Sequence, residues 1–332
     1  MRDFRSDNVH GCSPEIAEAL LRENRGTDTS YGGDAVTARV RERCRELFET
    51  DLEILPVITG TAANALSLSA LTPASGAVLC HADAHILRDE EGATEFFTGG
   101  AKYIPIDGAD GKLHPDDVRG VAGSSLSITN ATEAGTIYSA DEIRALCEAA
   151  GGLGVHVDGA RFANAVASSG ASPADLTWRS GVDLLSFGAT KNGAIGAELI
   201  VMFRKDVAAE LALRHRRGGH QPSKMRFISA QLEAYLANDL WLRNARHANA
   251  MAARLARALI AAGIEVVRPV EANIVFARFA PALVRRLNDE GFLFFDWPIF
   301  GPDIYRLVAG FATSEEDVDA LAAACAAAGT PL

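Results

Sequence analysis

Short apolar segments alternate with longer segments of helical periodicity over the first two-thirds of the chain. The short segments predict strands, and the longer ones, in which apolar residues recur at three- and four-residue spacing, predict helices. Strands are expected at residues 54–58, 77–80, 102–106, 125–129, 155–157 and 197–203, of which the last could run antiparallel. Helices are expected from Pro14, over 36–49, over 62–70 and after Ser139. Such alternation is typical of an α/β fold, in which helices cover both faces of a mostly parallel sheet.

The last third of the chain has a different pattern. Residues 224–260 contain neither Gly nor Pro and are rich in helix-forming residues, so they predict one long helix that links two domains. Beyond it, a strand is expected at 273–279, a helix at 281–289, strands at 292–295 and 305–309, and a final helix at 314–328. We therefore predict a large domain over residues 1–240 and a small α+β domain over residues 241–332.

Composition narrows the class of protein. The formal net charge of −11 over 332 residues disfavours non-specific binding to nucleic acid. No apolar run approaches the roughly 20 residues of a membrane-spanning helix, and residues 1–7 lack the apolar region of a secretory signal, so a cytoplasmic protein without membrane association is expected. The five cysteines form an odd set without a C-x-x-C pair, which argues against a disulfide framework and against a zinc site.

Two segments carry the most specific chemistry. Residues 155–161 (V-H-V-D-G-A-R) and 186–193 (S-F-G-A-T-K-N-G) place Asp158 and Lys191 at the ends of apolar strands, where ligands gather in open α/β sheets. Enzymes that use pyridoxal phosphate (PLP) need a lysine amine to hold the cofactor aldehyde as a Schiff base. They also need a carboxylate to keep the ring nitrogen protonated. Taken singly, each residue would more often be a turn-capping aspartate or a solvated lysine; their joint placement favours the PLP site.

Further candidates lie near other strand ends. Gly60 and Thr61 fall between a strand and a helix, where backbone amides could face a cofactor phosphate, although such a turn alone is usually an N-cap. His85 could stack on a planar cofactor ring and exchange protons, with Asp89 or Glu90 orienting it or a water; a surface histidine is the alternative.

Two arginines could bind the anionic groups of a substrate or cofactor, because a guanidinium fork matches a carboxylate. Arg161 follows Asp158 by one short turn. Arg306 interrupts an apolar strand and therefore needs an anionic partner, for which a structural salt bridge is the alternative explanation.

Together these segments resemble the threonine aldolase family of PLP enzymes. The resemblance extends over nearly the whole chain and rests on residues 4–8 (F-R-S-D-N), 31–34 (Y-G-G-D), 60–64 (G-T-A-A-N), 84–85 (A-H), 158–161 (D-G-A-R), 190–193 (T-K-N-G) and 306–308 (R-L-V). It implies a β-eliminating lyase of the aspartate-aminotransferase-like fold, the PLP-dependent transferase fold type I. The implied reaction is retro-aldol cleavage of L-threonine, L-allo-threonine or a related amino acid such as phenylserine to glycine and an aldehyde.

The resemblance also implies a role for each candidate. The cofactor would be held by Lys191 through its aldehyde, by Asp158 through the pyridinium nitrogen, by a stacked His85, by Gly60 and Thr61 through the phosphate, and by Arg161. The substrate carboxylate would be held by Ser6, Arg161 and Arg306, and Tyr31 would reach in from a neighbouring subunit. A homo-oligomer with shared active sites, either a dimer or a dimer of dimers (a homotetramer), is therefore expected, with a small-molecule amino acid as its substrate.

One position departs from the family pattern. Low-specificity members have a histidine shortly after the strand at 125–129, where this chain has Glu133. The base for the substrate hydroxyl is therefore open, and His85 acting with Asp89 is the favoured candidate. Another fold type I reaction, transamination or β-elimination, is the alternative function, since fold alone does not determine chemistry.

Overall fold

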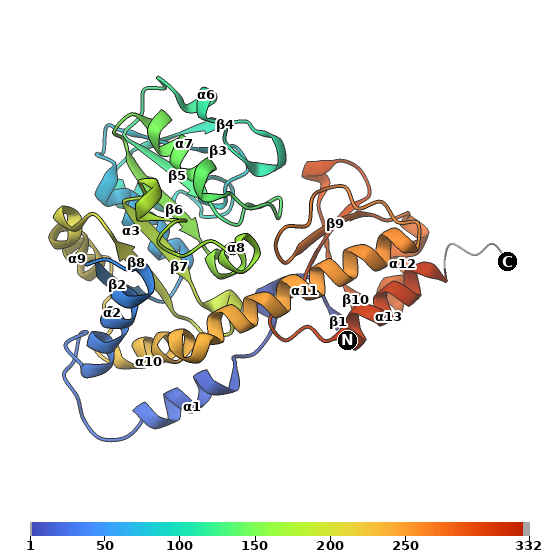
Figure 1. Ribbon diagram of the computed structural model, residues 1–332, viewed down its shortest axis with the longest axis horizontal. Helices are drawn as coiled ribbons and strands as arrows, with labels where there is room; N and C mark the ends of the chain where they lie inside the picture. The colour runs from blue at the N-terminus through green and yellow to red at the C-terminus, as the bar shows by residue number, and fades with distance from the viewer. Residues whose placement is uncertain (1, 328–332) are drawn as a thin grey trace.

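The computed structural model describes residues 2–327, and a seven-stranded sheet forms its centre (Figure 1). The strands are β2 (Glu53–Val57), β3 (Ala77–His81), β4 (Lys102–Ile106), β5 (Ser125–Thr129), β6 (Gly154–Gly159), β7 (Leu184–Gly188) and β8 (Glu198–Met202). Their order is β2-β8-β7-β6-β5-β3-β4, and only β8 runs antiparallel to its neighbours. The predicted α/β fold with a mostly parallel sheet is confirmed, as is the antiparallel direction of the strand predicted at 197–203.

Helices cover both faces of this sheet. They are α1 (Pro14–Glu23), α2 (Ala35–Phe48), α3 (Gly60–Leu71), α4 (His85–Arg88), α5 (Ala93–Thr98), α6 (Pro115–Val118), α7 (Ala140–Ala150), α8 (Phe162–Ser169), α9 (Ala208–Arg217) and α10 (Arg226–Leu236). Successive strand residues enter opposite cores. Leu185 packs into the core shared with α2, α7 and α10, whereas Leu184 packs on the opposite face with residues of α3 and α9. Because both faces are covered, the carboxyl edge of the sheet is left for a ligand.

The single helix predicted over residues 224–260 is wrong. Helix α10 ends at Leu236, and α11 (Leu240–Ala261) begins after a break at Asn238 and Asp239, whose φ angles are 51° and 55°. Asn and Asp tolerate this left-handed backbone better than other non-glycine residues, so a run without Gly or Pro can still turn. Helix α11 then crosses from the large sheet to the small domain, contacting α8 and α13 (Figure 1).

The small domain contains β9 (Ile274–Arg278), α12 (Pro281–Asp289), β10 (Phe292–Leu293), β11 (Phe295–Asp296), β12 (Ile304–Val308) and α13 (Glu315–Ala326). The single strand predicted at 292–295 is two short strands in different sheets, since β11 joins β12 and β9 while β10 pairs with β1 (Arg2–Asp3). The predicted end of the last helix, at residue 328, lies outside the described residues.

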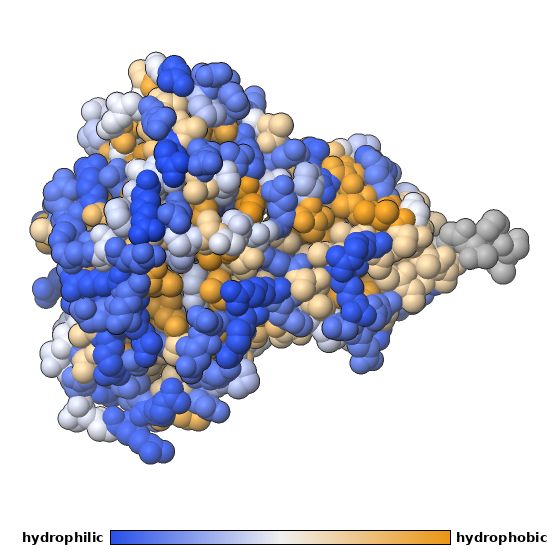
Figure 2. Space-filling model, viewed as in Figure 1, coloured by the Kyte–Doolittle hydropathy of each residue, from blue (hydrophilic) through white to orange (hydrophobic). Residues whose placement is uncertain are grey.

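The first strand thus pairs with the carboxyl-terminal part of the chain, and the division at residues 240 and 241 stays a prediction. Hydrophobic side chains gather on the surface of the small domain near β9, whereas the visible face of the large domain is mostly hydrophilic (Figure 2). Among the described residues, no helix has the length and apolar character needed to cross a membrane.

Candidate active site

A cavity of about 280 Å³ opens at the carboxyl edge of the large sheet. Asp158 lies at the end of β6, and Lys191 lies in the turn that follows β7. Because β6 and β7 are parallel neighbours, their ends bring both side chains to this cavity. Its lining comes from strand ends, turns and the start of α3, and consists of Asn8, Ile58, Thr59, Gly60, Thr61, Asn64, His85, Glu90, Glu133, Asp158, Ala160, Thr190, Lys191 and Glu198.

Asp158 is almost fully buried and is held by two hydrogen bonds. Its Oδ1 accepts from the backbone N–H of Ala160, and its Oδ2 accepts from the side-chain amide of Asn64, each at 3.0 Å. The same amide nitrogen donates to Glu90 Oε1 at 2.9 Å. Both oxygens of Asp158 are therefore fixed in direction, as a carboxylate that must meet a ring nitrogen requires.

His85 begins α4, and its Nδ1 lies 3.0 Å from Oε1 of Glu90, whose side chain is fully buried. This hydrogen bond raises the pKa of His85 above its ordinary value, although burial opposes the shift. The sequence favoured Asp89 as the residue acting with His85, and the structure corrects this. Asp89 is solvent-exposed and lines a second cavity, whereas the next residue, Glu90, is buried against the imidazole.

The start of α3 is a candidate anion site. Thr59 caps this helix by accepting a hydrogen bond from the Ala62 N–H at 3.1 Å, and the first two helical residues, Gly60 and Thr61, line the cavity. The N–H groups at a helix start have no partner within the helix, and the helix dipole adds positive potential there. A Cβ at Gly60 would meet no atom within 4 Å, so the backbone is open to a ligand at this point.

The turn that carries Lys191 is fixed by the residue after it. Asn192 donates from its side-chain nitrogen to the Tyr235 hydroxyl and to the Trp241 carbonyl, each at 2.8 Å. All three of these side chains are buried. The lysine is therefore presented from a rigid support rather than from a free loop.

Glu198 is a buried carboxylate that sequence reasoning missed. It begins β8, and because this strand runs against β7, its start lies at the carboxyl edge of the parallel strands. Its Oε2 accepts from the Ala189 N–H at 2.7 Å. Burial raises the pKa of Glu198 to about 7, even though hydrogen bonds from Thr190 and Ala189 and the charge of Lys191 act in the opposite direction.

Arg161 does not line the cavity but forms a buried ion pair. Its Nε and Nη2 donate to the two carboxylate oxygens of Asp7 at 2.7 and 3.0 Å, and Asp7 also accepts from Asn273. Burial alone would raise the pKa of Asp7, but the charges of Arg161 and Lys191 and these hydrogen bonds outweigh it and lower the pKa. The edge of the Arg161 guanidinium formed by Nε and Nη2 is therefore already occupied by Asp7, and no sequence pattern indicated this pairing.

Arg306 has no carboxylate partner among the described residues. Its guanidinium carbon lies 4.2 Å from the centroid of the Trp297 ring, its buried Nε makes no hydrogen bond within the described chain, and its Nη2 donates to the Arg5 carbonyl at 3.4 Å. Burial lowers the pKa of Arg306, and the charge of Arg161 nearby lowers it further. A cation that is stacked but unpaired in this way is available to a substrate carboxylate.

The last two predicted residues lie outside the cavity lining. Ser6 caps a short turn by accepting from the Asn8 N–H at 3.2 Å, and Asn8 lines the cavity in its place. Tyr31 is 54% exposed, and within the described part of the chain its hydrogen bonds are made by its backbone, with Ser223 and Gln221. Its side chain is free to meet another molecule, so its predicted contact with a neighbouring subunit stays a prediction.

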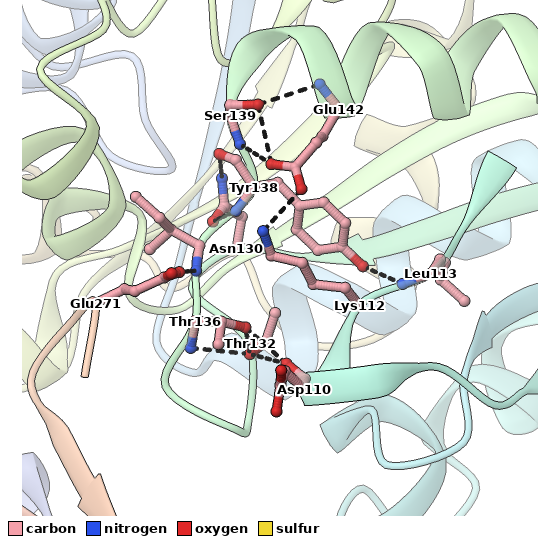
Figure 3. Close-up of polar contacts among 11 residues, drawn as sticks. Asp110, Lys112, Leu113, Asn130, Thr132, Thr136, Tyr138, Ser139, Glu142 and Glu271 are labelled. Carbon is pink, nitrogen blue, oxygen red and sulfur yellow. Dashed lines mark hydrogen bonds and ion pairs between the residues drawn. The ribbon is translucent and has the colours of Figure 1, made fainter. Parts of the chain in front are cut away.

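The loop that carries Glu133 is tightly anchored (Figure 3). The hydroxyls of Thr132 and Thr136 lie 2.7 Å apart, and the Thr136 hydroxyl donates to the Asp110 carbonyl at 2.7 Å. Farther along, the Ile137 N–H donates to Glu271 at 2.9 Å. The loop ends at the capping box of Ser139 and Glu142, with Glu142 also bound to Lys112. Glu133 is therefore held in the cavity wall by a fixed backbone.

These side chains fit PLP. The amine of Lys191 can take its aldehyde, the fixed carboxylate of Asp158 can take its ring nitrogen, and the open start of α3 can take its phosphate. Two buried acceptor atoms of the cavity wall, Asn64 Oδ1 and Glu90 Oε2, have no hydrogen-bond partner among the described residues. Within residues 2–327, no group of three His, Cys, Asp or Glu side chains is arranged to hold a metal ion.

Comparison with known proteins gives consistent matches. Residues 3–282 match the model of the beta-eliminating lyase family. The chain is 40% identical, over 97% of its length and 96% of the relative's, to the low specificity L-threonine aldolase of Pseudomonas sp. (strain NCIMB 10558). A threonine aldolase structure from Leishmania major has a TM-score of 0.93 at 25% identity and covers 99% of this chain and 100% of that one. Aspartate aminotransferase from Thermus thermophilus, at 17% identity and a TM-score of 0.71 over 98% of this chain and 91% of its own, shares the fold.

Proposed function

Because the chain belongs to the β-eliminating lyase family and, within it, to the threonine aldolases, we propose that it is a PLP-dependent carbon–carbon lyase. It cleaves an L-β-hydroxy-α-amino acid, such as L-threonine, L-allo-threonine or phenylserine, into glycine and an aldehyde. The observation that supports this most directly is the cavity shared by Lys191, Asp158, His85 and the start of α3.

When bound, PLP supplies a ring that withdraws electrons from the substrate Cα. The chain's own residues prepare the site for this. Lys191 offers the amine that tethers the cofactor aldehyde. Asp158, with both oxygens fixed by Ala160 and Asn64, would keep a proton on the ring nitrogen. The N–H groups of Gly60 and Thr61 hold the phosphate end.

His85 is oriented by its contact with Glu90 and would stack on the cofactor ring. The hydrogen bond with Glu90 raises the pKa of His85, and an imidazole at this position can both give and take a proton. Glu133 faces the same cavity from a fixed loop, near the place where the resemblance to low-specificity family members leads us to expect a histidine. We infer that His85 and Glu133 together handle the substrate hydroxyl proton, in place of the pair of His85 and Asp89.

Arg306 holds the substrate carboxylate. Ser6 and the N–H groups of Arg161 that do not bind Asp7 are the other predicted carboxylate-binding groups. The orientation that these groups would impose on the substrate determines which bond of Cα is positioned to break. The strongest support for this arrangement is that the guanidinium of Arg306 has no carboxylate partner within residues 2–327.

We further propose a homo-oligomer, a dimer or a dimer of dimers, in which the exposed Tyr31 of one subunit completes the site of another. The cytoplasmic location expected from the sequence stays a prediction.

The decisive experiment is a product assay. The purified protein is incubated with PLP and L-threonine, L-allo-threonine or phenylserine, and free glycine and aldehyde are measured. Release of glycine without any oxo-acid acceptor supports aldol cleavage, whereas formation of an oxo acid supports transamination or β-elimination. The Lys191→Ala variant should fold normally, lose the near-visible absorbance of the bound cofactor and release no glycine. Retained activity in that variant would exclude the proposed role of Lys191.

A further inference from the structure

Glu198 is a buried carboxyl group in the wall of the candidate active site, and none of the roles assigned above uses it. Backbone N–H groups of Ala189 and Thr190 donate to this carboxyl group, with the Ala189 contact at 2.7 Å to Oε2. We propose that Glu198 binds the phosphate of the cofactor in its protonated form, by donating a hydrogen bond to it, so that a proton is taken up when the phosphate binds. This inference rests on the proposed function.

The register of the sheet places Glu198 beside the start of α3. Glu198 pairs with Val57, the last residue of β2, and the chain then enters α3 at Gly60. Cross-strand partners project to the same face of a sheet, and Val57 and Ile200 both pack in the core on the face that α3 covers. Leu199 packs on the opposite face, so Glu198 points toward the face of α3, at the end where this helix begins.

The hydrogen bonds of Glu198 leave a carboxyl proton available to the cavity. Backbone N–H groups can only donate, so Ala189 and Thr190 cannot accept a proton from Glu198 through these contacts. Glu198 lines the same cavity as Gly60 and Thr61, whose N–H groups are proposed to hold the phosphate. A protonated Glu198 would therefore add an O–H donor to the donors at the start of α3.

The charge of a phosphate explains why the carboxyl group must be protonated. A phosphate ester carries a charge between about −1.5 and −2 at neutral pH, and a carboxylate beside it would be repelled. A carboxylic acid is neutral and donates a hydrogen bond instead. Burial already raises the pKa of Glu198 to about 7. A phosphate bound next to it would raise this pKa further, so binding of the phosphate and of the proton would favour each other.

The other ionisable groups around Glu198 leave this charge balance in place. Lys191, in the turn after β7, lowers the pKa of Glu198 but forms no ion pair with it within residues 2–327. Tyr235 of α10 stays neutral because burial raises the pKa of its phenol. Neither α3 nor the end of β2 beside Glu198 contributes an ionisable side chain. The remaining ionisable residues of the cavity lining are His85, Glu90, Glu133 and Asp158.

The first test measures the uptake of protons when a phosphate ligand binds. Pyridoxine 5′-phosphate, which has no aldehyde to react with Lys191, is titrated calorimetrically into the cofactor-free protein at pH 8, in two buffers with different ionisation enthalpies. Glu198 is mostly ionised at this pH before the ligand binds, since its pKa is about 7. The parent protein should therefore take up about one proton per ligand more than Glu198→Gln. The glutamine cannot ionise, but it keeps an acceptor for the Ala189 N–H and offers an N–H donor to the phosphate.

The affinity is a second readout. Above pH 7, the affinity of the parent protein for pyridoxine 5′-phosphate should fall by up to about tenfold per pH unit relative to that of Glu198→Gln. Pyridoxine, which lacks the phosphate, should show no such difference between the two proteins. Glu133→Gln is the matched control, because Glu133 lines the same cavity from the loop after β5. This control should take up as many protons as the parent protein.

Infrared difference spectra test the proposal on the parent protein, without relying on the folding of a variant. Binding of pyridoxine 5′-phosphate at pH 8 should produce a carboxylic-acid C=O band that Glu198→Gln lacks. Absence of this band, equal proton uptake in the parent and Glu198→Gln, or the same difference in uptake with pyridoxine would overturn the role of Glu198, even in an enzyme that releases glycine. If pyridoxine 5′-phosphate binds to neither protein and no substrate yields glycine, the proposed function fails and this inference fails with it.

Discussion

His85 and Glu90 form a direct contact, with the imidazole Nδ1 3.0 Å from the buried carboxylate oxygen Oε1. This carboxylate is shared, because the same oxygen accepts from Asn64, which in turn donates to Asp158. His85, expected above the cofactor ring, and Asp158, expected at the ring nitrogen, are thus linked through Glu90 and the side-chain amide of Asn64. A substitution at His85 or at Asp158 should therefore alter the hydrogen bonding of the other residue.

Glu90→Gln should lower the pKa of His85, because the hydrogen bond with Glu90 is the largest cause of its elevation. The acidic limb of the pH profile of kcat/KM should therefore move to lower pH. The shift can be read independently from the imidazole resonances of isotope-labelled protein. Asp89→Asn is the matched control, since Asp89 does not contact the imidazole. A shift in the Asp89 variant and none in the Glu90 variant would contradict the structure.

Asp158→Asn should weaken PLP binding and reduce turnover by roughly a hundredfold or more, since an amide cannot keep the ring nitrogen protonated. The two hydrogen bonds from Ala160 and Asn64 require an acceptor, and the asparagine can satisfy only one of them with its oxygen. Cofactor affinity is measured by absorbance titration and turnover by glycine release. Near-normal values for both would show that another group faces the nitrogen.

The residues predicted from strand ends are those that the structure brings together. Asp158, Lys191, Gly60 and Thr61 follow from a local rule, because the carboxyl ends of parallel strands share one edge. Glu198 lies at the same edge because it begins β8, which runs antiparallel to β7. The antiparallel direction was expected from the sequence, so this signal could have revealed the residue.

Other contacts could not be predicted, because they depend on tertiary packing. Asp7 and Arg161 are 154 positions apart, and nothing in either segment indicates that they pair. The choice of Glu90 over Asp89 depends on which of two adjacent carboxylates the chain turns inward after α4. The break between α10 and α11 depends on two left-handed residues that have no glycine signature.

Asp7→Asn should lower the free energy of unfolding by about 3 to 5 kcal/mol at pH 7, because it leaves the buried Arg161 charge without compensation. The pKa of Asp7 is lowered in the folded state, so its contribution is present above the ordinary carboxyl pKa and is lost as the pH falls through the folded value. The loss caused by the substitution should therefore shrink in acid. Urea titrations at pH 7 and at pH 3, which lies below the ordinary carboxyl pKa, measure this. Asp3→Asn, which removes a more exposed pair with Arg5, should have a much smaller effect.

The contribution of Glu198 to the free energy of unfolding should depend on pH in the opposite direction. Its pKa is raised from 4.5 to about 7 in the folded protein by burial, so ionisation opposes folding. Its contribution to stability is fully present below pH 4.5, where both states are protonated. It is lost as the pH rises toward 7, because the unfolded chain then ionises while the folded chain does not. The loss amounts to roughly 3 kcal/mol, from 1.36 kcal/mol per unit of pKa difference.

Glu198→Gln retains an acceptor for the Ala189 N–H but cannot ionise. The cofactor-free variant should therefore lose less stability than the parent protein between pH 5 and pH 8, measured from urea unfolding midpoints at both values. Glu148→Gln, an exposed carboxylate on α7, should behave like the parent. Because Lys191 lies close enough to influence Glu198, the same variant should also change the pH dependence of the near-visible absorbance once PLP is bound. If the stability of the Glu198→Gln variant changed with pH as that of the parent protein does, Glu198 would be ionised in the folded protein. The buried carboxylate would then need a compensating charge other than that of Lys191.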